Sequence, residues 1–260
     1  MPNTTPTHNF RQILGINFFN GNASQAAGLL QHGGLLVVPA APALKNLPWD
    51  TEYREALLSA DVVITDSALM VMLWNLLERD TLRRLSGLEY IRELLRSQDF
   101  CREAFWIMAS STSAARNISW MREQGLEVGN DSYYVAPVYH RPVEDRELLA
   151  RLRERQPKHI VVTIGGGTQE VLGLYLKQHL SYPAAIHCIG AAIAFLSGDQ
   201  VRIPVWADRL YLGWAFRCLA SPRRYVPRYW DARHLMPLLT KYRDRLPEVM
   251  RSLEAQKADA

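Results

Sequence analysis

The segment His159-Ile-Val-Val-Thr-Ile-Gly-Gly-Gly-Thr-Gln-Glu170 decides the fold that this sequence predicts. An apolar, largely β-branched run at 160–164 ends in three glycines, and a helical pattern follows from Thr168. Such a run is typical of a buried parallel strand that leads into a tight turn. Ligands of open α/β sheets bind at this point, because glycines let backbone N–H groups approach an anion. A tight turn without a ligand gives the same pattern, and the segment matches neither the dinucleotide fingerprint nor the P-loop.

The rest of the chain repeats this alternation of strand and helix. Similar apolar runs predict strands at 13–19, 35–39, 61–66, 104–109, 133–138 and 184–189. Helical patterns lie between them, at 24–31, 51–59, 67–78, 88–97, 114–124, 145–155, 170–180 and 191–196. This order predicts a layered, Rossmann-like α/β domain with a mainly parallel sheet over residues 1–200.

The composition changes at residue 201. Six arginines against one acid give 201–230 a net charge of +5, so the other residues sum to −1 of the overall +4. Aromatic residues interleave with these arginines, and we expect Pro204, Pro222 and Pro227 to interrupt any long helix. Residues 201–260 are therefore predicted to form a basic, aromatic, helical appendage.

Three roles fit the aromatic residues of this appendage. They could pack as core, or they could meet anionic lipid headgroups, with tryptophan at the interface and arginine on phosphates. The same composition suits single-stranded nucleic acid. A nucleic-acid partner is not expected, because the rest of the chain offers no surplus positive charge to extend a binding track.

Composition also bounds the class of protein. With 260 residues, 48% hydrophobic and 22% charged, the chain can bury a full core. Cys101, Cys188 and Cys218 lack metal-ligand spacing and are expected to be reduced thiols. No histidines pair at helical spacing, so neither a metal nor a cofactor is predicted. The first residues lack a signal pattern and no apolar run reaches 18 residues, so we expect neither export nor membrane spanning.

Four positions are candidates for chemistry. Asp66 ends a predicted strand, a usual place for a catalytic carboxylate, although a helix cap or turn residue is more often found there. Arg84 could hold a phosphate through its planar fork, or simply be solvated. Gln169 and Glu170 lie in the first turn after the glycines, where Glu170 could instead satisfy the helix dipole.

Four short blocks, in this order, together resemble the WecG/TagA/CpsF glycosyltransferases, glycosyltransferase family 26, over about residues 13 to 230. They are Ile64-Thr-Asp66-Ser67, Arg84-Leu-Ser-Gly87, Gly165-Gly-Gly-Thr-Gln169-Glu170, and Phe195-Leu-Ser-Gly198-Asp-Gln-Val-Arg202-Ile-Pro204 continuing into Trp214-Ala-Phe-Arg217-Cys-Leu-Ala-Ser-Pro222-Arg-Arg224-Tyr225 and Arg228-Tyr229.

The resemblance implies an inverting, metal-independent enzyme that needs no cofactor. Such enzymes move a sugar from a UDP-sugar donor onto a polyprenyl-diphosphate glycolipid acceptor. They are peripheral proteins at the cytoplasmic face of the bacterial inner membrane and serve surface polysaccharide or exopolysaccharide synthesis. A homo-oligomer is also compatible with the sequence.

The resemblance assigns roles to residues of this chain. Asp66 would be the general base that deprotonates the acceptor hydroxyl. The donor would be bound by Gly165, Gly166, Gly167, Gln169, Glu170 and Gly190. The diphosphates would be neutralised by Arg84, Arg217 and Arg224. Membrane contact would come from Trp206, Trp214, Arg223, Arg228 and Trp230.

The chain departs from the family pattern in four places. Val38-Pro-Ala-Ala41-Pro42 replaces a polar Thr-x-Asn-like element, Ser67 replaces glycine after the aspartate, Gly167 replaces proline, and Gly213 replaces the glutamate before Trp214. The first change points to the xanthan-type branch, which uses UDP-glucose, rather than to an N-acetylmannosamine donor. Two rivals stay open: a non-catalytic protein that binds a UDP-sugar or lipid carrier, and a soluble α/β enzyme acting on a phosphorylated metabolite. Neither the acceptor sugar, the linkage, nor a role for 231–260 follows from the sequence.

Overall fold

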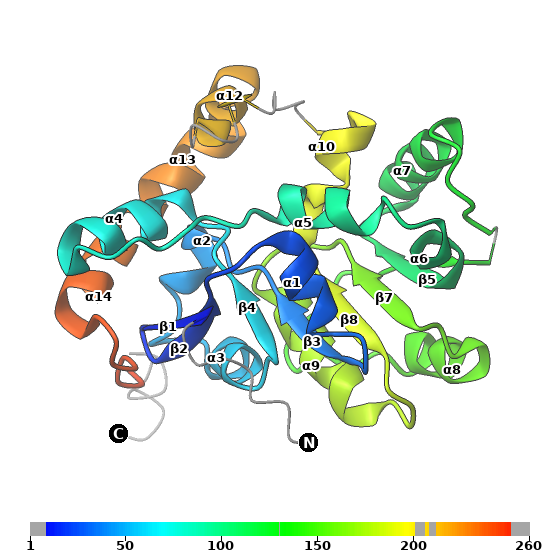
Figure 1. Ribbon diagram of the computed structural model, residues 1–260, viewed down its shortest axis with the longest axis horizontal. Helices are drawn as coiled ribbons and strands as arrows, with labels where there is room; N and C mark the ends of the chain where they lie inside the picture. The colour runs from blue at the N-terminus through cyan, green and yellow to red at the C-terminus, as the bar shows by residue number, and fades with distance from the viewer. Residues whose placement is uncertain (1–8, 130, 201–205, 208–211, 251–260) are drawn as a thin grey trace.

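The computed structural model describes residues 9–129, 131–200, 206–207 and 212–250. An eight-stranded sheet with the order β1-β2-β4-β3-β8-β7-β5-β6 lies at its centre (Figure 1). The β1–β2 pair is antiparallel and the other pairs are parallel, which confirms the predicted α/β fold. The strands are β1 (Phe10–Ile13), β2 (Ile16–Phe19), β3 (Gly34–Val37), β4 (Val62–Ile64), β5 (Ala104–Met108), β6 (Tyr133–Val135), β7 (His159–Val162) and β8 (Ala185–Cys188).

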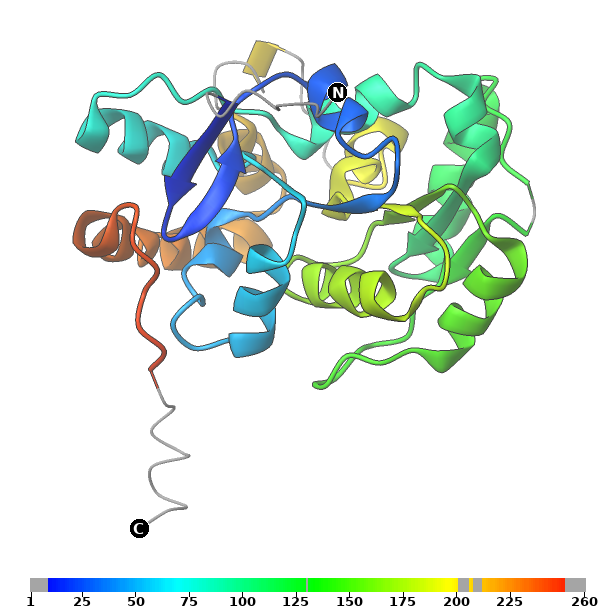
Figure 2. The same cartoon turned by 60° about the horizontal axis from the view of Figure 1, so that its bottom comes forward.

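Helices cover both faces of this sheet. Along β3, Leu35 and Val37 join one hydrophobic cluster, whereas Leu36 and Val38 join the other. The first cluster packs under α2 (Ala41–Leu44), α3 (Thr51–Leu58), α4 (Ala68–Glu78), α8 (Arg146–Arg155), α9 (Thr168–His179) and α14 (Leu235–Tyr242). The second packs under α1 (Ala23–Gly28), α5 (Gly87–Leu94), α6 (Gln98–Glu103), α7 (Ser111–Glu123), η2 (Gly190–Ala192) and α10 (Ala194–Ser197). Figure 2 shows α3 and α9 next to each other on one face.

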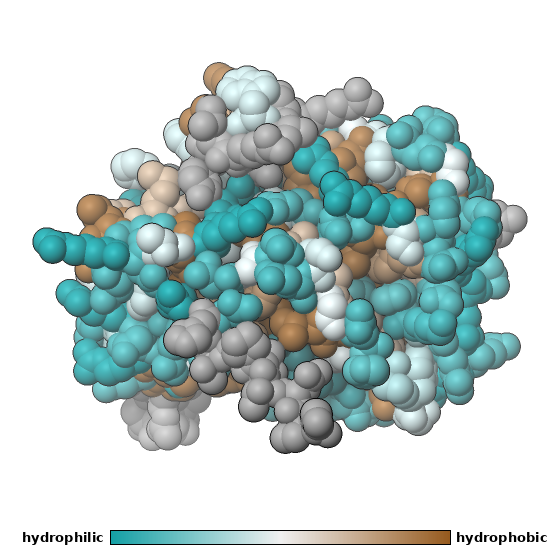
Figure 3. Space-filling view, in the orientation of Figure 1, coloured by the Kyte–Doolittle hydropathy of each residue, from teal (hydrophilic) through white to brown (hydrophobic). Residues whose placement is uncertain are grey.

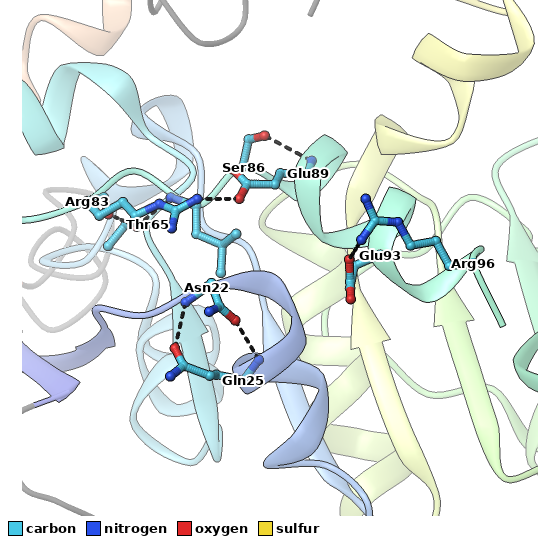
Figure 4. A network of polar contacts seen from close by, with 9 residues as sticks. Asn22, Gln25, Thr65, Arg83, Ser86, Glu89, Glu93 and Arg96 are labelled. Carbon is cyan, nitrogen blue, oxygen red and sulfur yellow. Dashed lines mark hydrogen bonds and ion pairs between the residues drawn. The ribbon is translucent and has the colours of Figure 1, made fainter.

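Short polar side chains fix where the helices begin. Asn22 and Gln25 form a reciprocal capping box at α1, and the Ser86 hydroxyl accepts the Glu89 N–H at the start of α5 (Figure 4). Ser67 caps α4 in the same way, by accepting the Met70 N–H. These caps hold the helix starts at the carboxyl edge of the parallel strands.

The strand expected at 13–19 is confirmed only for β2, because a turn interrupts it at residues 14 and 15 and the preceding residues form β1 of an antiparallel hairpin. Leu14 and Gly15 make the turn with φ of 50° and 73°. Their N–H groups donate to the carbonyls of Arg243 and Asp244, over 2.6 and 2.8 Å, so the distant C-terminal segment stabilises the turn. Strand 133–138 was expected to be longer than β6 is, and the short helices α2 and α6 were not predicted.

The described residues from 212 to 250 form two separate parts. Helices α12 (Gly213–Ala220) and α13 (Pro222–Ala232) pack on each other at the edge of the molecule where α10 lies (Figure 1). As expected, Pro222 interrupts the helical segment, because it separates α12 from α13 and starts α13, where no N–H is needed. The expectation was wrong for Pro227, which lies within α13, and Pro204 lies outside the described residues. By contrast, α14 packs against α4 and adds Leu235 and Leu239 to the main core. Among the described helices, none combines the length and apolar character required to cross a bilayer.

Candidate active site

A pocket of about 570 Å³ opens at the carboxyl edge of the sheet, between α4 and the α12–α13 pair. We call it the Asp66 pocket. Six residues singled out from the sequence line it together: Asp66, Arg84, Trp214, Arg217, Arg228 and Trp230. The structure therefore brings the strand end and the C-terminal basic region to one site, although more than 140 positions separate them in the chain.

Asp66 lies two residues after the end of β4, and its side chain is 29% exposed. The Gly87 N–H at the start of α5 donates to Asp66 Oδ1 over 3.0 Å. Because Ser67 caps α4, the Asp66 carboxylate does not serve as the cap of that helix. Gly87 lies so close to the sheet that a Cβ there would sit 3.2 Å from the Val38 side chain, so glycine permits this approach.

Arg84 is held beside Asp66 from two directions. Its Nε donates to the Asp66 carbonyl over 2.8 Å, and its Nη2 lies 3.9 Å from Asp66 Oδ1. The segment that carries it is fixed by buried Thr65, whose hydroxyl donates to the Arg83 carbonyl and accepts the Leu85 N–H (Figure 4). Its guanidinium is 14% exposed, so Arg84 is not a solvated surface cation.

Arg217 reaches the same pocket from α12. Its Nη1 donates to the Tyr229 hydroxyl over 2.9 Å, and its guanidinium stacks over the Phe195 ring at 4.4 Å. Its buried Nε has no hydrogen-bond partner among the described residues. Burial raises the pKa of Tyr229, and the nearby Asp66 carboxylate adds to this rise, whereas Arg217 opposes it. The α12–α13 pair therefore lies within electrostatic reach of the candidate base.

The remaining appendage candidates are placed differently. Arg223 is exposed on α13 outside the pocket lining, and the Arg224 side chain lies outside the described residues. Trp206 is 56% exposed and meets Phe216 edge-on. Met72 of α4 lines the pocket but was not singled out from the sequence, because no local pattern distinguishes it from core residues. Tyr229, which belongs to the Arg228-Tyr229 block, also lines the pocket, although no role was assigned to it from the sequence.

The glycine loop, Gly165–Gly167, connects β7 to α9 at the same edge of the sheet. Gly165 and Gly166 are exposed, and Gly167 adopts a φ of 93°, which favours glycine. Two of the predicted donor residues lie beneath the loop instead of on its surface. Gln169 is 2% exposed and Glu170 is completely buried.

These two buried residues tie the strand ends together. Gln169 Oε1 accepts the Gly190 N–H over 2.6 Å, and its Nε2 donates to Glu170 Oε1 over 3.0 Å. The other Glu170 oxygen accepts the Gly167 N–H over 2.6 Å. Burial raises the pKa of Glu170 to about 7, while these hydrogen bonds and Arg141 oppose the rise. Glu170 thus shapes the loop from below.

The glycine loop and the Asp66 pocket lie at the same edge of the sheet, with the ends of β3 and β8 between them, and the residues that line the pocket include none from the loop. Strands β4, β3, β8 and β7 are consecutive and parallel, so Asp66, Ala40, Gly190 and Gly165 all follow carboxyl ends at that edge. Gly87, which binds Asp66, would place a Cβ 3.4 Å from the Ile189 carbonyl just before Gly190. A ligand that contacts both the loop and the carboxylate must therefore cross the ends of β3 and β8.

The chemistry of the pocket combines one carboxylate with several cations. Arg84, Arg217 and Arg228 line it together with Asp66, so its formal charge favours an anionic ligand. A partly exposed carboxylate can accept a proton from a bound hydroxyl, and guanidinium groups suit phosphate oxygens. Within the described part of the chain, no three His, Cys, Asp or Glu residues gather as metal ligands.

Comparison with known proteins gives consistent matches. The model of a family described as "Glycosyl transferase WecG/TagA/CpsF family" matches residues 11–248. An N-acetylglucosaminyldiphosphoundecaprenol N-acetyl-beta-D-mannosaminyltransferase of Bacillus spizizenii is 25% identical over 212 residues, 78% of this chain and 79% of that protein. A protein of the same name from Bacillus subtilis is 24% identical over 187 residues, 69% and 71% of the two chains.

Proposed function

The chain belongs to the WecG/TagA/CpsF glycosyltransferase family, and from this premise we propose that it moves a hexose from a UDP-sugar to a sugar on polyprenyl diphosphate. Its relatives are named for a GlcNAc-diphosphoundecaprenol acceptor, which supports a lipid-diphosphate acceptor here. The observation that carries the proposal is the shared pocket, in which Asp66 lies among Arg84, Arg217 and Arg228.

In the proposed reaction, an acceptor hydroxyl attacks C1 of the donor sugar from the face opposite UDP. The bond between C1 and the phosphate oxygen breaks, and Asp66 takes the hydroxyl proton. UDP leaves with the electron pair, and the arginines stabilise the charge that develops on its diphosphate. The configuration at C1 is inverted, and no protein-bound metal is required in this scheme.

The donor site is proposed at the glycine loop, whose exposed Gly165 and Gly166 leave room for a diphosphate. In the neighbouring Asp66 pocket, Ala40, Ala41 and Pro42 form the wall where the family carries a polar element. No side chain in this stretch can donate a hydrogen bond to an acetamido group. We therefore expect UDP-glucose to bind better than N-acetylated UDP-hexoses.

The membrane surface is proposed to comprise α4, α12 and α13. Trp214 is 51% exposed and Trp230 is 67% exposed, and Leu76 on α4 is 76% exposed. Apolar side chains are visible at the surface over α4 and α12 in Figure 3. Tryptophan and arginine on one surface suit the headgroup region of an anionic bilayer. This arrangement would place the Asp66 pocket beside the lipid that carries the acceptor.

The test is a transfer assay with labelled UDP-glucose, UDP-N-acetylglucosamine and UDP-N-acetylmannosamine, polyprenyl-diphosphate sugar acceptors, and EDTA. Asp66→Asn should lose 10²- to 10⁴-fold in turnover, the usual contribution of a general base, while UDP binding persists. Asp80→Asn is the matched control, because Asp80 pairs with Arg11 outside the pocket lining. Wild-type turnover by Asp66→Asn would refute the base assignment. UDP binding without transfer by the unaltered protein would favour a non-catalytic binder.

A further inference from the structure

We propose that Arg141 is a positioning residue for the UDP-sugar, because it donates a hydrogen bond to the glycine loop at Gly167, the residue whose N–H binds Glu170. The proposal rests on the donor role of this loop. Arg141 lies between β6 and α8, about 25 positions before the loop, and no motif singles it out. Its Nη2 donates to the Gly167 carbonyl over 3.2 Å.

The same guanidinium is anchored on a second helix. Arg141 Nη1 donates to Glu52 Oε2 over 2.7 Å, and Nη2 donates to Asp50 Oδ2 over 2.8 Å. Asp50 is itself fixed, because its other oxygen caps α3 by accepting the Tyr53 N–H over 2.9 Å. Arg141 therefore connects the first turn of α3 to the turn that starts α9.

The glycine loop depends on such outside support. Positions where a Cβ would stand on Gly165, Gly166 and Gly167 have no described atom within 4 Å, so side-chain packing does not hold this side of the loop. Hydrogen bonds to both backbone groups of Gly167 hold the loop instead. The Glu170 carboxylate accepts the Gly167 N–H, and Arg141 donates to the Gly167 carbonyl. A loop held open before the donor arrives does not lose ordering entropy on binding.

The charges around Arg141 argue for positioning rather than direct contact with the donor. Its guanidinium already contacts two carboxylates, Asp50 and Glu52, so its positive charge is compensated before any diphosphate arrives. A planar fork is required to reach two carboxylates and a carbonyl at once, and a lysine ammonium cannot reproduce it.

The experiment uses the full chain and compares Arg141→Met with Arg102→Met. Arg102 lies on α6, away from the loop. It is a matched control, because it also pairs with two carboxylates, those of Asp99 and Glu127. Hydrogen exchange of a peptide covering 163–170 reports the loop without any ligand. Calorimetry with UDP reports the donor site, and circular dichroism confirms folding.

We expect Arg141→Met to exchange faster over this peptide and to bind UDP about tenfold more weakly, because the loop must then be ordered when UDP binds. Arg141→Lys should resemble it, and Arg102→Met should match the unaltered protein. Glu52→Gln distinguishes a role of Arg141 in positioning the loop from a role in direct contact with the diphosphate. It should weaken UDP binding if Arg141 positions the loop, and it should tighten binding if a released Arg141 contacts the diphosphate.

Unchanged exchange or unchanged UDP affinity in Arg141→Met would overturn the proposal, as would tighter binding by Glu52→Gln. Another outcome is that the unaltered protein binds no UDP while Arg141→Met still exchanges faster over the loop. That result would refute the proposed donor role of the loop but would support the hydrogen bond between Arg141 and Gly167. These outcomes distinguish failure of the inference from failure of the proposed function.

Discussion

Glu170→Gln tests the buried carboxylate beneath the glycine loop. Glu170 is completely buried, and burial raises its pKa from an ordinary 4.5 to about 7. Between these values the folded protein holds a proton that the unfolded chain releases, so this group lowers stability as pH rises from 4.5 to 7. The difference corresponds to about 3 kcal/mol above pH 7, at about 1.4 kcal/mol for each pKa unit.

Glutamine cannot ionise, so the variant loses this pH dependence. It keeps one oxygen acceptor, whereas the carboxylate serves both the Gly167 N–H and Gln169 Nε2. The lost hydrogen bond should cost about 1 to 3 kcal/mol at every pH. We therefore compare the free energy of unfolding of the variant with that of the unaltered protein. The difference between the two should change by about 2.5 kcal/mol from pH 5 to pH 8, in the direction that favours the variant.

The assay is urea unfolding followed by tryptophan fluorescence at several pH values, with both proteins measured side by side. Taking the difference between them cancels other titrating groups. Glu154→Gln, on the exposed side of α8, is the control and should show no such trend. A Glu170→Gln difference that stays constant from pH 5 to pH 8 would refute the raised pKa and the reasoning built on burial.

Two further predictions concern the opposite pH response and the proposed lipid surface. Burial lowers the pKa of His187 to about 3, so stability should fall as pH drops below 6.5, by about 2 kcal/mol at pH 5. His187→Leu should remove this acid sensitivity in urea unfolding, and an equal acid loss in the variant would contradict the assignment. Replacing both Trp214 and Trp230 by alanine should weaken sedimentation with anionic vesicles at least tenfold. The control Trp49→Ala, 56% exposed outside α12–α13, should bind normally, and unchanged binding of the double variant would place the membrane contact elsewhere.

Strands and strand ends that depend on residues adjacent in the sequence could be predicted from the sequence. The buried strand before Gly165 and the strand end at Asp66 follow from local patterns of apolar and polar residues, and both are where we expected them. The turn at Leu14 could not be predicted, because a leucine with positive φ is stabilised by carbonyls from residues 243 and 244. Arg141 escaped notice for the same reason, since its partners come from α3 and the glycine loop.

Burial likewise could not be read from the pattern around Gln169 and Glu170. Their position just after the glycines suggested that they face a ligand, but both side chains turn inward. The signal that could have revealed this is the capping arrangement itself, in which a glutamate at the third helical position accepts the N–H of the cap residue.

The return of the C-terminal segment to the core has a consequence for synthesis. Residues of α14 cover α4, and the following segment binds the hairpin turn through Arg243 and Asp244 and reaches Pro48 through the Met250 N–H. While the ribosome is still making the chain, the buried side of α4, with Met70 and Trp74, lacks part of its cover. Domains fold as their segments emerge, and exposed apolar surface invites aggregation. Completion of this enzyme's core therefore requires nearly its last described residues, and we expect a stalled or truncated chain to expose this apolar surface.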